Sequence, residues 1–125
     1  MTEWRQSFWK MSENIVITDE AKLLSSLGMC ARAGAAIIGV PLICTAMKKG
    51  GAKAPIMVFE ASDSSDNTHK RISDRCAYYG VKQIRLGCSG MALAAALGKT
   101  ASVAAVAVTD ANLCRLAEKY IRFAL

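Results

Sequence analysis

The chain has few of the residues that usually build a metal or catalytic site. It contains a single histidine, His69, and five cysteines that show no C-x-x-C spacing. A zinc site would depend almost entirely on scattered thiols, so the sequence argues against one. The cysteines fall within apolar or helical patterns and are expected to be small buried side chains in a reducing compartment. We therefore expect neither a metal nor a cofactor.

Long uncharged runs are also absent. The longest spans residues 33–47 and is interrupted by Gly39 and Pro41, so it is too short to cross a bilayer. Glu3 and Glu13 break up the N-terminal region, which argues against a signal peptide. We expect a cytoplasmic protein without a membrane partner.

Aromatic residues make up only 6% of a sequence that is 53% hydrophobic, so the core must be built mainly from aliphatic side chains. At 125 residues the chain fits one domain, which would bury roughly two thirds of the surface of the unfolded chain. Sixteen Lys and Arg against ten Asp and Glu favour a polyanionic partner such as nucleic acid. An ordinary solvated basic surface would give the same excess.

Strands and helices are expected to alternate between residues 52 and 110. The pattern predicts strands at Ala54–Phe59, Lys82–Leu86 and Ser102–Val108, and helices at Thr68–Tyr79 and Ser89–Leu97. Asp66 or Asn67 is expected to cap the first of these helices. Repeated crossovers of this kind predict an α/β fold in which helices cover a sheet.

Two further helices are expected before this region and one after it. Thr18 or Asp19 would cap a helix that Gly34 ends, and a short edge strand would follow at Ala35–Ile38. The next helix would begin at Gly39-Val-Pro41, where proline is tolerated, and end at Gly50-Gly51. The last helix is expected over 110–125, as an ordinary amphipathic surface helix.

Residues 1–18 are expected to form an N-terminal extension to a single domain at 19–125. Trp4, Phe8, Met11 and Ile15 recur at helical spacing and form an apolar stripe. This stripe would pack on the domain or on a second copy of the chain. A membrane-surface helix is less favoured, because the acidic residues of the extension oppose anionic lipid.

No group of residues forms a recognisable catalytic motif. Gly87–Gly90 resembles a nucleophile elbow, but Met91 stands where that motif needs glycine. Gly98-Lys99-Thr100 resembles the end of a phosphate-binding loop, but Leu93 replaces its first glycine and a strand follows. His69 has aspartates nearby, as a general base would, yet we interpret it as an exposed side chain in the first turn of a helix. The protein is therefore not expected to be an enzyme.

The cluster from Lys48 to Lys53 is the remaining candidate for function. Its ammonium groups lie beside glycines at a helix end, where they can follow an RNA backbone without reading its sequence. The same lysines also suit the negative end of the helix dipole, so both interpretations stay open.

Several sequence blocks resemble one protein family. They are Asp66–Thr68, Ile72–Val81, Leu93–Lys99 and Val106–Asp110. With these blocks the chain, over roughly residues 23–117, resembles the kink-turn RNA-binding ribosomal-protein superfamily, of the L-seven-Ae and L-thirty-e type. It is most similar to the small bacterial YlxQ-like members, which are encoded near translation genes. The resemblance implies a three-layer α/β/α sandwich with a mixed four-stranded sheet, no enzyme activity, and binding of a sharply bent RNA.

The resemblance also points to an RNA-contact segment that departs from the family pattern. RNA-binding members read G-x-N-E-x-x-K at the start of the second core helix, and Gly39 matches the first position. Pro41 stands for the Asn, Leu42 for the Glu and Thr45 for the Lys. Each good polar contact to a base is worth about 1–3 kcal/mol, so the loss of these three polar side chains would lower the specific affinity for RNA by several powers of ten.

Basic residues remain elsewhere in the implied contact surface. Lys49 falls at a position that is basic in many members and faces RNA phosphate, with Lys48 beside it. Lys99 and Thr100 begin the second contact loop, and Ala94 replaces a family glycine just before it.

Two functions follow from these observations. The first is a ribosomal-protein-like module that binds a kink-turn or related structured RNA, with ribosome association as one form of that partnership. The alternative is a homologue without RNA binding that contacts a protein or forms a homodimer, through the apolar Val40–Ile43 segment or the N-terminal extension.

Overall fold

The computed structural model describes residues 15–123, which fold into helices and strands in alternation. The helices are α2 (Glu20–Arg32), α3 (Val40–Lys49), α4 (Asp66–Tyr79), α5 (Gly90–Ala96) and α6 (Ala111–Glu118). The strands are β1 (Ile15–Ile17), β2 (Ala36–Ile38), β3 (Met57–Glu60), β4 (Lys82–Arg85), β5 (Ala105–Val108) and β6 (Ile121–Phe123).

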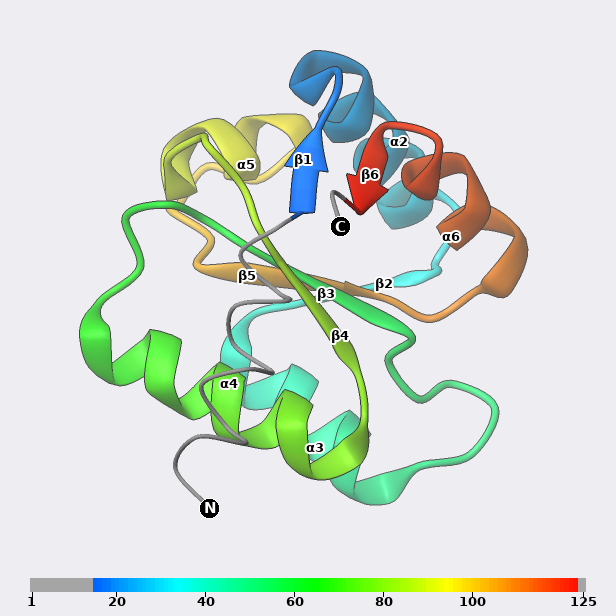
Figure 1. Ribbon diagram of the computed structural model, residues 1–125, viewed down its shortest axis with the longest axis vertical. Helices are drawn as coiled ribbons and strands as arrows, with labels where there is room; N and C mark the ends of the chain where they lie inside the picture. Colours follow the sequence, from blue (N-terminus) through cyan, green and yellow to red (C-terminus); the bar gives the residue numbers. More distant parts are fainter. Residues whose placement is uncertain (1–14, 124–125) are drawn as a thin grey trace.

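Four of these strands form the central sheet, in the order β2-β5-β3-β4. The β3–β4 pair is parallel, whereas β5 runs antiparallel to both of its neighbours. Helices α3 and α4 cover one face of the sheet, and α2, α5 and α6 lie on the other (Figure 1). The predicted α/β/α sandwich with a mixed four-stranded sheet is confirmed, and β2 is the edge strand that the sequence indicated.

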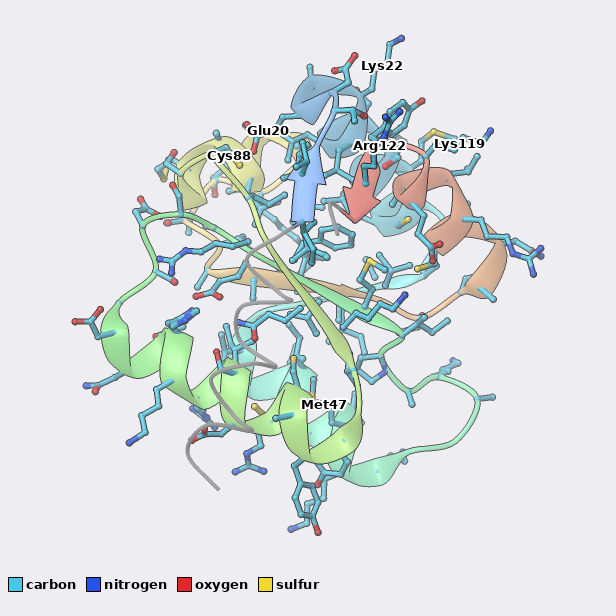
Figure 2. All side chains as sticks on the ribbon, in the orientation of Figure 1. Glu20, Lys22, Met47, Cys88, Lys119 and Arg122 are labelled. Atoms are coloured by element: carbon cyan, nitrogen blue, oxygen red, sulfur yellow. The ribbon has the colours of Figure 1, made fainter. Side chains whose placement is uncertain are left out.

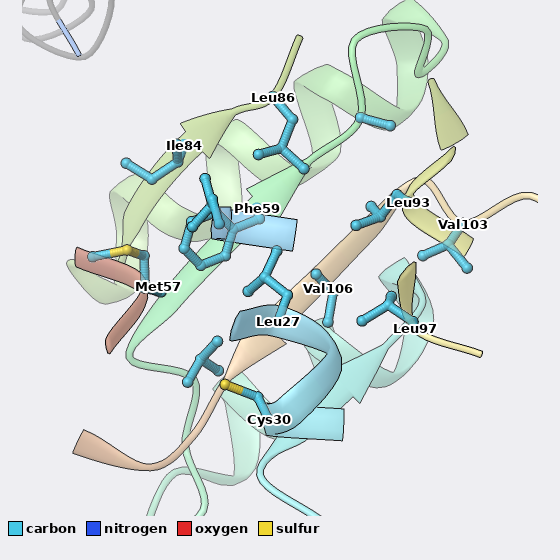
Figure 3. Close-up of a cluster of buried hydrophobic side chains, with 14 of the residues drawn as sticks. Leu27, Cys30, Met57, Phe59, Ile84, Leu86, Leu93, Leu97, Val103 and Val106 are labelled. Atoms are coloured by element: carbon cyan, nitrogen blue, oxygen red, sulfur yellow. The ribbon is translucent and has the colours of Figure 1, made fainter. Parts of the chain in front are cut away.

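The central strands are buried on both faces, so their side chains supply two separate cores. On β5, Val106 and Val108 pack with the α2, α5 and α6 layer, while Ala105 and Ala107 pack with α3 and α4. The same alternation on β3 places Phe59 in the first core. Figure 3 shows its ring among the aliphatic side chains of that core.

The C-terminal region differs from the prediction of one continuous helix over 110–125. Helix α6 ends at Glu118, and the chain then extends into β6. This strand pairs antiparallel with β1, and the Thr18 amide donates to the Tyr120 carbonyl at 2.8 Å. Backbone pairing to a distant strand has overridden the local helical pattern.

The same pairing corrects the prediction for the start of the described chain. Ile15 was expected in a helical stripe with Trp4, Phe8 and Met11, but it lies in strand β1. The other three residues of that stripe lie outside the described residues. The two strands join the segment before α2 to the segment after α6 (Figure 1).

The helix boundaries depend on identifiable caps. Asp19 caps α2 by accepting from the Lys22 amide at 3.1 Å, as one of the two predicted options. The cap of α4 is Ser65, which accepts from the Thr68 amide at 3.2 Å, so the prediction of Asp66 or Asn67 is wrong. Serine and the two predicted residue types are about equally good caps, which is why composition alone does not choose among them.

The five cysteines are free thiols, and only Cys88 is partly exposed. Burial, followed by the nearby Cys44 and Glu60 side chains, raises the pKa of Cys76 to about 12. Burial and then Glu118 raise the pKa of Cys114 to about 11. These thiols behave as small core side chains, as the sequence predicted.

Two kinds of feature are absent from the part of the chain that the structure describes. Between residues 15 and 123, no three or more His, Cys, Asp or Glu side chains gather in a way that would hold a metal ion. Within the same range, every helix is too short or too polar to cross a bilayer.

Candidate nucleic-acid interface

The start of α3 and the loop after α5 enclose a shallow pocket at one end of the sheet. Gly39 makes the turn from β2 into α3 with φ of +102°, a conformation that favours glycine. Its amide donates to the Ala105 carbonyl at 3.0 Å, which ties the turn to the neighbouring strand. The pocket is lined by residues 38–41, Thr68 of α4 and residues 99–104.

The loop on the far side of this pocket is anchored at both ends. The Lys99 amide donates to the Ala94 carbonyl at 2.8 Å, and the Val103 amide donates to the Gly90 carbonyl at 3.0 Å. The Gly90 amide in turn donates to the Asp63 carboxylate at 2.9 Å. Between these anchors, residues 99–102 are exposed. The loop is therefore held in place while its polar residues face solvent.

A second hollow lies on the other side of α3, along the edge strand β2. Ile37, Leu42 and Thr45 line it together with Lys49 and Lys99. Lys99 lines both hollows, so the two are adjacent. No Asp or Glu lines either of them among the described residues, which leaves the lysine charges unopposed there.

Three of the predicted contact positions carry no polar group that is available for base recognition. Pro41 has no N–H, and Leu42 is apolar with 61% of its surface exposed. The Thr45 hydroxyl donates to the Pro41 carbonyl at 3.0 Å, so it is engaged within its own helix. The start of α3 therefore presents a small apolar surface.

The structure brings together most of the predicted site residues. Gly39, Pro41, Lys99 and Thr100 share the first hollow, and Leu42, Thr45 and Lys49 line the second. Lys48 lines neither; it is exposed in the last turn of α3. We call these residues, Lys48 apart, the α3 contact surface.

The apolar segment Val40–Ile43 is less available than the sequence suggested. Val40 is 8% exposed and Ile43 is 1% exposed, because both pack into the core beneath α3 and α4. Only Pro41 and Leu42 of this segment face solvent.

A buried polar cluster next to the first hollow was not predicted. Glu60, at the end of β3, has no exposed surface, and its carboxylate accepts from Gln83 Nε2 at 2.8 Å and from the Ser64 hydroxyl. His69 Nδ1 lies 2.8 Å from one carboxylate oxygen and 2.9 Å from the other.

This contact corrects the interpretation of His69 as an exposed side chain, since only 29% of the side chain is accessible. The signal in the sequence was a carboxylate at the end of an otherwise apolar strand, because a buried charge requires partners. The cluster fixes the first turn of α4, from which Thr68 reaches the pocket.

Comparison with known proteins shows relatives that cover most of the domain. No family model matches the chain. It is 36% identical over 84 residues to the RNA-binding protein YlxQ of Bacillus subtilis (strain 168), covering 67% of this chain and 79% of that protein. It is 37% identical over 60 residues to RNA-binding protein YlxQ of Enterococcus faecium, covering 48% of this chain and 55% of that protein.

Solved structures agree with this relationship. A protein of unknown function from Bacillus halodurans has a TM-score of 0.70 and 31% identity, and the match covers 81% of this chain and 97% of that one. The 15.5kD RNA binding protein of Giardia lamblia has a TM-score of 0.64 at 18% identity, covering 80% of this chain and 85% of that one. The second comparison concerns the fold alone.

Proposed function

The chain belongs to the YlxQ family of RNA-binding proteins, within the L-seven-Ae-like group, and we propose that it binds structured RNA through the α3 contact surface. The RNA would contain a sharp bend of the kink-turn type. The observation that carries the proposal is the meeting of two segments far apart in sequence, the start of α3 and residues 99–104, around hollows that lysines line.

The side chains favour recognition of shape and phosphate over recognition of bases. Lys49 and Lys99 can each neutralise a phosphate and release counterions, which makes affinity depend steeply on salt. Pro41 and Leu42 can pack against sugars or base faces but cannot read base edges by hydrogen bonding. We therefore expect a preference for bent over straight RNA with weak discrimination among base sequences.

Filter binding across a salt series tests this proposal. A kink-turn RNA is compared with a straight duplex of the same composition. The kink-turn should bind more tightly. The salt slope, which is the magnitude of the slope of log affinity against log salt concentration, should fall by about two in the Lys49→Gln, Lys99→Gln variant, since each duplex phosphate contact contributes about 0.9. The matched control, Lys22→Gln with Lys119→Gln, removes the same charge from exposed lysines of α2 and of the turn after α6. Equal affinity for both RNAs, or no binding, would refute specific recognition.

Association with the ribosome is a narrower form of the same proposal, in which the bent RNA is ribosomal. Co-sedimentation with isolated ribosomal subunits tests it. Loss of the protein from the subunit peak in the lysine double variant, with retention of the control variant, would support contact through the α3 contact surface.

A second candidate function, pairing of two copies, rests on the exposure of Pro41 and Leu42. Two exposed residues give a small apolar patch for a homodimer, which usually buries a larger and more apolar area. Sedimentation at several concentrations, with Leu42→Lys alongside, tests it, and a wild-type protein that is monomeric throughout would exclude it.

A further inference from the structure

Positive charge is concentrated on one face of the molecule. Helices α3 and α4, with the turn after α3, carry six basic side chains: Lys48, Lys49, Lys53, Lys70, Arg71 and Arg75. Only Asp66 and Asp74 oppose them on these segments. None of the six makes an ion pair within residues 15–123. In the layer across the sheet, α2 and α6 with their caps carry four basic and four acidic side chains.

Two of the arginines and a tyrosine lie along one exposed stripe of α4. Arg71, Arg75 and Tyr78 are spaced at i, i+4 and i+7, which places them on the same side of the helix. The opposite side of α4 carries Ile72 and Cys76, which are buried against the sheet. We call Arg71, Arg75 and Tyr78 the α4 stripe.

Tyr78 is the most exposed of the large hydrophobic side chains described, with 82% of its surface accessible. Its ring contacts the Tyr79 ring edge to face, with centroids 4.8 Å apart and planes at 81°. Tyr79 is partly buried and packs against the core beneath α3 and α4. The Tyr78 ring is thus supported by a neighbour while most of it faces solvent, as a stacking platform for a base requires.

The α4 stripe continues from the α3 contact surface. Thr68, in the first turn of α4, lines the first hollow, and Arg71 follows it by about one turn. From Thr68 to Tyr78 the helix rises about 15 Å. A stacked strand advances about 3.4 Å per nucleotide, so this distance corresponds to four or five nucleotides. A strand leaving the pocket along α4 would pass both arginines and reach the ring.

Asp74 is the carboxylate of α4 that lies next in sequence to the α4 stripe. It lies four residues after Lys70 and three after Arg71 on the exposed side of α4, and within the described residues it forms an ion pair with neither. Lys70, Arg71 and Arg75 outnumber it three to one on this side of the helix, so the surroundings of the α4 stripe remain suited to an anion.

We propose that the α4 stripe binds an unpaired RNA segment that continues from the bent element, with Arg71 and Arg75 on phosphates and Tyr78 stacked on a base. This inference rests on the proposed function, because the bent element delivers the segment to α4. Phosphate neutralisation next to an exposed aromatic ring is the combination that single-stranded nucleic acid fits.

The test compares a bent RNA without a tail with the same RNA carrying a ten-nucleotide unpaired tail at either end. One of the tails should raise the affinity of the wild-type protein about tenfold or more. Tyr78→Ala should remove most of that gain, and Tyr78→Phe should retain it, because stacking needs the ring and not the hydroxyl.

The arginines are tested through salt dependence. Arg71→Gln with Arg75→Gln should lower the salt slope of the tailed RNA by about 1.4, at about 0.7 per single-strand phosphate. The control pair Lys22→Gln and Lys119→Gln, which Figure 2 shows far from α3 and its Met47, should leave the effect of the tail unchanged.

The two proposals fail in different ways. If the tailless RNA binds but neither tail increases affinity, the α4 stripe is not an RNA site and the proposed function stands. If the tailless RNA does not bind while the free ten-nucleotide strand binds through Tyr78, the proposed function fails, and with it the continuation from a bent element, while the α4 stripe is retained as a site for unpaired RNA. Self-association that Tyr78→Ala abolishes, without any effect of a tail, would assign the stripe to a protein partner and overturn the inference.

Discussion

The buried carboxylate of Glu60 gives the sharpest test of what holds the site together. Glu60→Leu removes the acceptor that Gln83, Ser64 and His69 share. A leucine fills most of the space but leaves three donors without their common partner. Hydrogen bonds to a charged group contribute about 1.5–3 kcal/mol each, and partly exposed donors recover some of this from water.

We therefore expect Glu60→Leu to lower the free energy of unfolding by about 3 kcal/mol, out of the 5–15 kcal/mol typical of a domain. With a urea m-value of about 1.5 kcal/mol per molar, the unfolding midpoint should fall by about 2 M. The m-value itself should not change, because the fold stays compact.

A double-mutant cycle separates the contact from the effect of the new side chain. His69→Leu also removes one donor of the cluster, so the Glu60→Leu, His69→Leu double variant should be more stable than the sum of the single losses predicts. The coupling should reach about 1–2 kcal/mol, since the two residues are in direct contact. A midpoint within about 0.3 M of wild type for Glu60→Leu, or strict additivity in the cycle, would refute the reasoning.

Three further predictions concern packing, capping and pH. Gly28→Ala should destabilise the fold by about 1–3 kcal/mol in thermal melts, because its Cβ would lie 2.6 Å from the Ala96 carbonyl oxygen. The control Ser25→Ala, on the exposed side of α2, should leave the stability unchanged. Ser65→Ala should lower the free energy of unfolding, measured in urea, by about 1 kcal/mol, and Asn67→Ala should lower it by less than half as much. The reverse order would mean that Asn67, as predicted from the sequence, caps α4. The free energy of unfolding should fall as pH rises from about 9 toward 11, because the thiols of the unfolded chain ionise near pH 9.0 while the pKa of Cys76 in the folded protein is about 12. Urea unfolding at each pH measures this fall, and it should be smaller in Cys76→Ala than in the wild-type protein.

The sequence predicted the central sheet well because its strands are short apolar runs between clear breaks. β3 and β5 are buried on both faces, so every position there selects an apolar residue, with Glu60 as the exception. Glycines with positive φ, such as Gly39 and Gly80, stand at the predicted helix boundaries. Local chemistry and tertiary structure agree in this region, which explains the accuracy of the prediction.

The sequence failed where a distant partner decides the structure. Residues 121–123 carry a helical pattern, yet they form β6 because they pair with β1, which lies at the other end of the described sequence. His69 was misassigned because its partner, Glu60, lies nine residues away on a different element. Tyr78 shares one side of the predicted helix with Arg71 and Arg75, but its exposure could not be predicted, since an exposed tyrosine and a buried one look alike in sequence. The residues of the candidate site were predicted through the family resemblance, whereas the two hollows that they line could be seen only in the structure.

Mapping of amide chemical shifts on addition of a kink-turn RNA tests the central proposal most directly. The largest changes are expected at Gly39, Leu42, Thr45, Lys49, Lys99 and Thr100, with the amides of α2 and α6 nearly unaffected. A saturating response confined to α2 and α6, or no response at RNA concentrations that saturate a kink-turn-binding control protein, would contradict the account.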